Sequence, residues 1–158
     1  MLKGRNITLR PLQNSDLDFL FTIENNKELW RYGSEKKQFT KSELSSYIVT
    51  AETDITISQQ YRFVIDLNYQ PIGFIDLFDY NVESSGVGVI IDKHYRKNGY
   101  ATEALRMLIE YAFGNLKLKQ LNCKIAADNI ASIRLFTSCH FDFIKLENKL
   151  NYYSLKNV

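Results

Sequence analysis

The stretch YRKNGYATEAL, from Tyr95 to Leu105, joins two segments of different periodicity. Before it, the run GVGVII (residues 86–91) is apolar and rich in β-branched residues, which predicts a buried strand. From about Gly99 to Phe113, apolar residues recur at helical spacing and form one stripe. The residues between these segments are polar and positively charged. The stretch therefore predicts a strand, a basic turn and an amphipathic helix in direct succession.

The start of this helix has the composition of an anion site. A helix N-terminus presents unpaired backbone N–H groups and the positive end of the helix dipole. Gly99 would let an anion approach the backbone, and Arg96 and Lys97 add positive charge. The alternative is a turn whose basic residues are only solvated. The patterns GxxxxGK[ST] and GxGxxG do not occur in the chain, so neither a Walker loop nor a dinucleotide fingerprint is indicated.

Length and composition indicate one globular domain over residues 1–158, with 45% apolar and 24% charged residues. The net charge of +2 is too small to suggest a nucleic-acid partner. No apolar run has the length of a membrane span or the character of a signal peptide. Cys123 and Cys139 lie in apolar patterns, and no Cys/His cluster has zinc spacing. We therefore expect buried thiols, no metal, no membrane partner and a cytoplasmic protein.

The remaining patterns predict an α/β (α+β) fold with a mixed sheet and helices on both faces. Strands are expected at residues 6–10, 61–67, 72–80, 86–91, 121–127, 141–146 and 152–155. Helices are expected from a cap at Ser15, from a capping box formed by Thr40 and Glu43, and over residues 131–138. The polar turn 68–71 predicts that the two strands around it form an antiparallel hairpin.

A second polar helix start follows the strand at 121–127. Asn129 and Ser132 both stand where a side chain can cap the helix over 131–138. Together with the Gly99 turn, this segment gives two helix starts on either side of one predicted strand.

These features resemble the GNAT family of N-acetyltransferases over nearly the whole chain. The family's Arg/Gln-x-x-Gly-x-Gly/Ala motif stands here as RKNGYA, residues 96–101, and its Asn-x-x-Ser/Ala motif stands at Asn129 and Ser132. The resemblance is strongest to ribosomal-protein N-terminal acetyltransferases and spermidine acetyltransferases. It implies a GNAT-like, mostly antiparallel sheet and acetyl-CoA as cosubstrate. The acceptor would be a primary amine of a protein N-terminus, a polyamine or another small amine.

The resemblance also assigns the cofactor to three segments. It implies that the strand residues Val89, Ile90 and Ile91 pair with the pantetheine arm and polarise the thioester carbonyl through their backbone N–H groups. It implies a pyrophosphate loop made by Arg96, Lys97, Asn98, Gly99, Tyr100, Ala101 and Thr102. It implies that Asn129, Ser132 and Phe136 line the side of the thiol.

The residues for proton transfer and acceptor binding follow less directly. Asp76 is a candidate base or a ligand for a cationic amine, and the alternative is a solvent-facing strand carboxylate. Ser132 could orient a water or the thiol, and the alternative is a helix cap. Tyr32 and Glu35 lie where the family builds its acceptor pocket, and the alternative is a surface loop.

Three positions depart from the family pattern. His140 stands where a glycine is usual. Phe136 stands where a tyrosine usually acts as the acid, and Gly86 stands where an acidic residue is often found. These departures keep open a second hypothesis, a non-catalytic acyl-CoA-binding or regulatory GNAT-like domain. A third hypothesis, an RNA-binding module, rests only on 13% aromatic residues and the positive net charge, and no RNP-like motif supports it. A homodimer is a further possibility that the sequence leaves open.

Overall fold

The computed structural model describes residues 1–26 and 38–158, which form an eight-stranded sheet in the order β1-β2-β3-β4-β5-β6-β8-β7. The strands are β1 (Leu2–Lys3), β2 (Thr8–Pro11), β3 (Tyr61–Leu67), β4 (Gln70–Phe78), β5 (Ser84–Ile91), β6 (Gln120–Ala126), β7 (Asp142–Glu147) and β8 (Leu150–Lys156). The helices are α1 (Leu17–Glu24), α3 (Lys41–Thr50), α4 (Ile55–Ser58), α5 (Tyr100–Gly114) and α6 (Ile130–Ser138). β5 and β6 are parallel and every other pair is antiparallel, which confirms the mixed, mostly antiparallel sheet.

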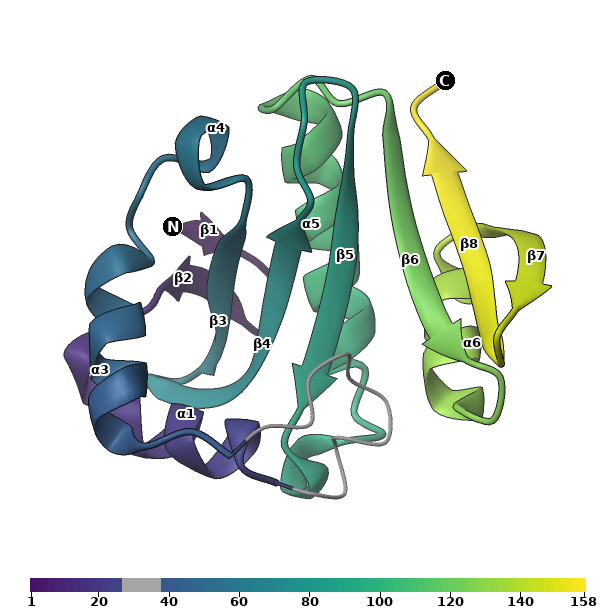
Figure 1. The fold of residues 1–158 in the computed structure, drawn as a ribbon. Helices are drawn as coiled ribbons and strands as arrows, with labels where there is room; N and C mark the ends of the chain where they lie inside the picture. The colour runs from purple at the N-terminus through teal and green to yellow at the C-terminus, as the bar shows by residue number, and fades with distance from the viewer. Residues whose placement is uncertain (27–37) are drawn as a thin grey trace.

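Helices cover both faces of this sheet, as predicted (Figure 1). On one face, α5 buries Leu105 and Leu108 against the sheet, and α6 adds Phe136 to the same core. On the other face, α1 and α3 bury Leu20 and Leu44 in a second core that includes Val64 and Phe74 of the sheet. Each helix buries one apolar stripe, which is why the helical periodicity was readable in the sequence.

The helix starts confirm one capping prediction and overturn another. The capping box at Thr40 is present, since the Glu43 N–H donates to Thr40 Oγ1 at 3.1 Å. Ser15 does not cap α1, because the residue at the N-cap position is Asp16. Its carboxylate accepts the Gln13 N–H at 2.8 Å and closes a short 3-10 turn before the helix. The short elements β1 and α4 were not predicted, because two to four residues carry too little periodicity.

A buried ionic cluster links β2 to β3 and to the residues before α1. The Arg10 guanidinium donates to Asp16 through two bonds of 2.8 Å and to Asp66 on β3 through one of 2.6 Å. Asp16 is 1% exposed and Asp66 is 8% exposed. Hydrogen bonds to Asp16 raise the pKa of Arg10 further above its usual range despite burial, so the guanidinium remains charged. The cluster joins β2, β3 and the entry to α1.

Glu103 ties the first turn of α5 to the turn between β1 and β2. Its carboxylate accepts the Asn6 N–H at 2.9 Å and the Ile7 N–H at 3.1 Å. Burial opposes the charged form of Glu103, but these hydrogen bonds outweigh it and lower the pKa below the ordinary value of 4.5. The start of α5 is therefore held in place by a carboxylate on its own first turn.

We expect Glu103→Gln to lower the free energy of unfolding by about 1–2 kcal/mol at pH 7, because hydrogen bonds to a charged acceptor are replaced by weaker ones. A carboxylate with a lowered folded-state pKa stabilises the fold above its unfolded pKa, and this contribution is lost as the pH falls through the folded pKa. The difference between wild type and variant should therefore shrink in acid. Urea denaturation at pH 7 and at about pH 3.5 measures it. An equal difference at both pH values would contradict the assignment.

Both cysteines are buried and unpaired, as predicted. Cys123 and Cys139 are each 4% exposed, and neither forms a disulfide. Burial raises the pKa of the Cys123 thiol to about 12, so it stays protonated at neutral pH.

Candidate active site

The sheet opens between its two parallel strands. β5 and β6 pair only where Ser84–Gly86 faces Gln120–Asn122. Beyond this point β5 continues to Ile91 and β6 to Ala126 without any pairing between them. Figure 1 shows the two strands separating toward the end of the sheet at which α6 begins. The fold therefore leaves an opening inside an otherwise continuous sheet.

One wall of the opening is the backbone of β5. Val89 packs against the core under α5, whereas Ile90 packs against the core under α1 and α3. Since successive side chains point to opposite faces, the N–H and C=O groups on the β6 side of this strand point into the opening. Such a backbone edge can bind an extended ligand as an added strand does. The predicted cofactor residues Val89, Ile90 and Ile91 all lie on this edge.

The basic loop at the end of β5 is held by its own side chains. The Arg96 Nε donates to the Ile91 carbonyl at 3.0 Å, and the Asn98 side chain donates to the Arg96 carbonyl at 3.0 Å. Lys97 and Gly99 have positive φ values of 65° and 83°. His94 is a surface residue beside Asp92, with Nδ1 2.8 Å from Asp92 Oδ1. The conformation of the loop is therefore fixed by hydrogen bonds between its own side chains and backbone.

The loop ends at the exposed start of α5. The first helical bond runs from the Glu103 N–H to the Gly99 carbonyl at 3.1 Å, so the helix does not pair the N–H groups of Tyr100, Ala101 and Thr102. A Cβ atom at Gly99 would find no heavy atom within 4 Å, which shows that the space beside this backbone is open. Open N–H groups next to Arg96 and Lys97 have the geometry that favours an anion, and anion binding here stays a prediction.

We expect Gly99→Val to raise the Kd for coenzyme A roughly 10- to 100-fold, the scale of about 1–3 kcal/mol for unmade hydrogen bonds. A valine side chain would occupy the open space and is strained at a φ of 83°. Calorimetry measures the affinity, and the thermal midpoint checks the fold. The matched control is Gly114→Val, at the other end of α5, where a Cβ also meets nothing. Unchanged affinity in a folded Gly99→Val protein would show that the loop does not bind phosphate.

The second polar helix start lies on the other side of the opening, after β6. Asn129 caps α6, with its Oδ1 accepting the Ser132 N–H at 3.2 Å, which confirms the capping role for Asn129. Ser132 contributes its backbone to this cap and not its hydroxyl. Within residues 1–26 and 38–158, its half-buried hydroxyl makes no side-chain hydrogen bond. A contact between these residues and the cofactor thiol stays a prediction.

Phe136 is part of the core under α6. It is 3% exposed, and its ring meets the ring of Phe141 edge-on at a centroid distance of 5.0 Å. The phenyl ring therefore has a packing role that the sequence reasoning did not assign to it. Its contact with the cofactor also stays a prediction.

An ionic cluster lies on β3 and β4, on the side of β5 away from the opening. Arg62 stands opposite Asp76 in the strand register and donates to both of its carboxylate oxygens at 2.8 Å. Arg62 also binds the Glu24 carboxylate at the end of α1 and lies over the Phe74 ring at 5.0 Å. Burial alone would lower the pKa of Arg62, but the charges of Asp76 and Glu24 raise it, so this 18% exposed side chain stays charged.

Sequence reasoning found Asp76 but missed Arg62. The hairpin turn alone does not give this pairing, because a register shift between Ile65 and Asp66 moves the partners by one residue before the strands reach Arg62. Asp76 is therefore neither an isolated base nor a purely solvent-facing carboxylate.

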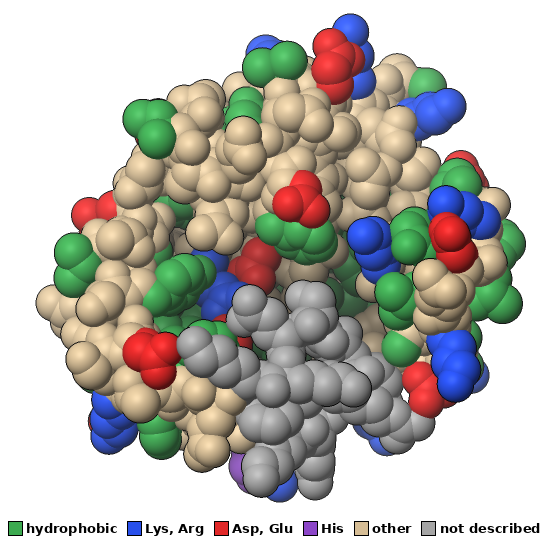
Figure 2. All heavy atoms as spheres, in the orientation of Figure 1, with side chains coloured by type: hydrophobic (Ala, Val, Ile, Leu, Met, Phe, Trp, Pro, Cys, Tyr) green, Lys and Arg blue, Asp and Glu red, His purple; other side chains and the backbone are tan. Residues whose placement is uncertain are grey.

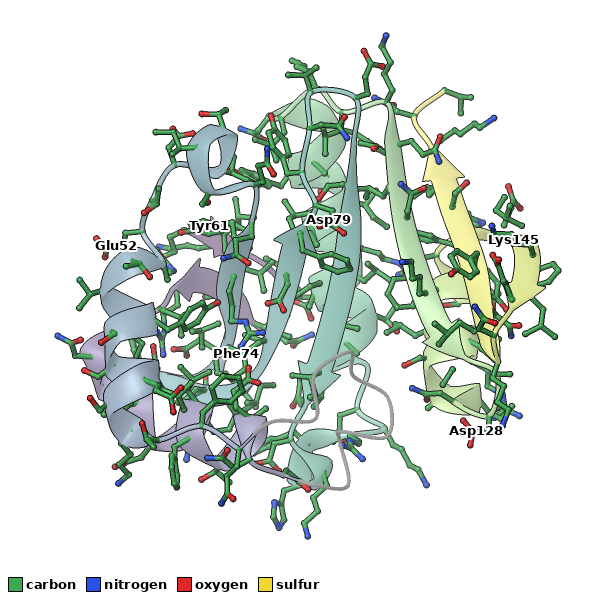
Figure 3. All side chains as sticks on the ribbon, in the orientation of Figure 1. Glu52, Tyr61, Phe74, Asp79, Asp128 and Lys145 are labelled. Atoms are coloured by element: carbon green, nitrogen blue, oxygen red, sulfur yellow. The ribbon has the colours of Figure 1, made fainter. Side chains whose placement is uncertain are left out.

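A cavity of about 70 Å³ lies beside this cluster, between α3, α4 and the strands. It is lined by Tyr47, Thr50, Ala51, Ser58, Gln60, Tyr61, Arg62, Asp76, Leu77 and Phe78. Burial raises the pKa of Tyr47, so its hydroxyl is protonated at neutral pH. Figure 2 shows acidic and basic side chains at the bottom of a hollow on this face, and Figure 3 shows Phe74 beside α1 and α3. In register, Asp76 also faces Gly88 of β5, the strand that borders the opening.

Some predicted residues and properties need separate mention. Tyr32 and Glu35 lie outside the described residues. In the described ranges, no group of three or more His, Cys, Asp and Glu side chains could hold a metal ion. No helix in those ranges is long and apolar enough to cross a membrane.

Comparison of the sequence with known proteins identifies a family and several relatives. The acetyltransferase (GNAT) domain family matches residues 6–142 of the chain. The spermidine N(1)-acetyltransferase of Escherichia coli K12 is 26% identical over 143 residues, which cover 89% of this chain and 75% of the relative. The corresponding enzyme of Vibrio cholerae is 26% identical over 138 residues, covering 85% and 78%.

Solved structures share the fold. Spermidine N-acetyltransferase from Vibrio cholerae, in complex with CoA and spermine, superposes with a TM-score of 0.87 at 22% identity, over 97% of this chain and 96% of that one. A ribosomal L7/L12 alpha-N-protein acetyltransferase in complex with coenzyme A has a TM-score of 0.83 at 17% identity, over 97% and 95%. At these identities the similarity concerns the fold.

Proposed function

Because the chain belongs to the GNAT acetyltransferase family, it is an acetyl-CoA-dependent N-acetyltransferase, and we propose that its acceptor is a polyamine or a similar alkyl amine. The observation that carries the proposal is the Asp76 side chain in the wall of a cavity with aromatic residues, on the strand next to the open edge of β5. Acetyl-CoA supplies the acetyl group, and the acceptor supplies a primary amine.

The cofactor side of the proposal uses the residues around the opening. The N–H groups at the start of α5, with Arg96 and Lys97, would hold the pyrophosphate. The unpaired edge of β5 would bond the pantetheine arm and polarise the carbonyl that the amine attacks. The hydroxyl of Ser132 is available to orient a water that takes the proton of the amine.

The acceptor side rests on Asp76 and its surroundings. A carboxylate has about four lone-pair sites, and Arg62 occupies one on each oxygen, so Asp76 can still accept hydrogen bonds from an ammonium group. The aromatic side chains Tyr47 and Phe78 line the same cavity and can attract a cation through their ring faces. In support, two of the relatives are named spermidine N(1)-acetyltransferases.

The test is the release of coenzyme A thiol from acetyl-CoA by the purified protein. The acceptors are spermidine, spermine, 1,4-diaminobutane, hexylamine and a peptide with a free N-terminus. We expect the highest kcat/KM with the polyamines. A preference for the peptide would refute the polyamine proposal, and no release with any acceptor would favour the non-catalytic acyl-CoA-binding domain.

We also propose that the protein forms a homodimer through β7, an edge strand of the sheet. Phe143, Ile144 and Leu146 on this strand are 56–60% exposed, and an exposed apolar edge favours association with a second copy. A spermidine N-acetyltransferase structure from Vibrio cholerae is dodecameric, which supports an oligomer in this family. Light scattering should give a dimer or larger assembly for wild type and a smaller one for Leu146→Lys. A wild-type monomer at micromolar concentration would refute this.

We further propose a cytoplasmic location. The support is that Cys123 and Cys139 are reduced and unpaired, as is usual in a reducing compartment. Cell fractionation tests it, and recovery in an extracellular fraction would refute it.

A further inference from the structure

Two glycines of β5, Gly86 and Gly88, lie opposite Phe78 and Asp76 of β4, and the ring of Phe78 lies over both. In the antiparallel register, Gly86 faces Phe78 and Gly88 faces Asp76. A Cβ atom at Gly86 would lie 2.4–2.8 Å from three ring atoms of Phe78, and one at Gly88 would lie 3.7 Å from a fourth. The Phe78 ring therefore crosses β5 above Gly86 and reaches Gly88. Any side chain at position 86 would need the space that the ring occupies.

The ring stands where the cavity meets the opening. Phe78 and Asp76 both line the cavity, and Gly86 is the last residue of β5 that pairs with β6. The backbone of Phe78 is fixed, because the fully buried Ser85 hydroxyl donates to its carbonyl at 3.0 Å. The half-buried ring thus presents an apolar surface next to the Asp76 carboxylate and to the strand edge that faces the opening.

We infer that Phe78 is a specificity-determining residue, whose ring is the wall against which the methylene carbons beside the reactive nitrogen pack. The inference rests on the alkyl-amine acceptor proposed above. Asp76 would bind the nitrogen while the ring contacts its carbon chain, since apolar and charged walls stand side by side. A peptide N-terminus carries a carbonyl on the carbon next to its nitrogen, and this carbonyl would lose its water against the ring without gaining a hydrogen bond. The ring therefore favours amines on plain methylene chains.

The test compares Phe78→Leu and Phe78→Ala with wild type, using spermidine and a peptide N-terminus as acceptors. We expect Phe78→Ala to lower kcat/KM for spermidine about 10- to 200-fold, mainly through KM, which is the range for changed contacts in an apolar pocket. Phe78→Leu should lose less. The ratio of spermidine to peptide activity should fall, and the Kd for coenzyme A should not change. Tyr69→Ala removes a fully exposed aromatic ring in the β3–β4 turn and is the control with unchanged kinetics.

The glycine provides a reciprocal test. Gly86→Ala should displace the ring and imitate Phe78→Ala, whereas adding Gly86→Ala to Phe78→Ala should change kcat/KM little further, because the ring is no longer there to be displaced. Additive effects of the two changes would overturn the inference, as would a spermidine-to-peptide ratio that Phe78→Ala leaves unchanged. If wild type acetylates no alkyl amine, the proposed acceptor and the inference both fall. If wild type does and the ratio is insensitive to Phe78, only the inference falls.

Discussion

Asp76→Asn should lower kcat/KM for spermidine about 10²-fold, mostly by raising KM, because the partly buried carboxylate proposed to bind the cationic acceptor is replaced by a neutral amide. Asparagine keeps the shape of the side chain and one acceptor oxygen, so Arg62 retains a hydrogen-bond partner. Initial rates at several spermidine concentrations, with acetyl-CoA saturating, separate KM from kcat. The thermal midpoint of the variant reports any loss of the ion pair with Arg62.

The matched control is Asp79→Asn, an exposed carboxylate three residues further along the chain (Figure 3). Its kinetics should remain at the wild-type level. If Asp76→Asn instead lowered kcat at unchanged KM, and the size of this decrease varied with pH, Asp76 would be assigned to proton transfer. Equal effects of the two substitutions would show that only the overall negative charge matters.

Arg10→Met should lower the free energy of unfolding by about 3–5 kcal/mol, the cost of leaving buried charges without their partner. Asp16 and Asp66 would lose three hydrogen bonds from the guanidinium and have almost no access to water. Urea denaturation monitored by circular dichroism measures the loss. A folded and active variant at low temperature would show that the cluster supports stability and not chemistry.

The control for this substitution is Lys41→Met. Lys41 and Asp18 form an ion pair at 3.0 Å whose side chains are 58% and 86% exposed, so its removal should cost less than about 1 kcal/mol. If both substitutions lowered the free energy of unfolding by the same small amount, the Arg10 cluster would not stabilise the fold as its burial suggests.

Local patterns were enough to predict most of the architecture. The hairpin of β3 and β4, the capping box at Thr40 and the strand–loop–helix unit around Gly99 each depend on neighbours within a few residues. Such signals are present in the sequence because propensity, periodicity and turn chemistry agree there. Ser15 failed as a cap because the carboxylate next to it, Asp16, is held by the side chain of Arg10 and accepts the Gln13 N–H.

The candidate site was predictable only in part, because its walls come from segments far apart in the chain. The loop predicted to bind an anion is one continuous segment and could be recognised from its own residues. The pairing of Arg62 with Asp76 and Glu24 needs the strand register and the position of α1. The fit of Phe78 over Gly86 needs the register of β4 and β5. Gly86, which in the sequence only replaces an acidic residue of the family pattern, therefore leaves room for the Phe78 ring, and only the fold shows this.

The short contact between β5 and β6 also has a consequence for the dynamics of the molecule. Three residue pairs join the half-sheet β1–β5 to the half-sheet β6–β8, so local unfolding could begin at this seam. A pantetheine arm of coenzyme A bound along β5 would add contacts between the two half-sheets. Bound coenzyme A should then slow amide hydrogen exchange in residues 87–91 and in the adjoining end of β6 more than elsewhere in the sheet. The cofactor would be a structural member of the enzyme as well as its acetyl donor.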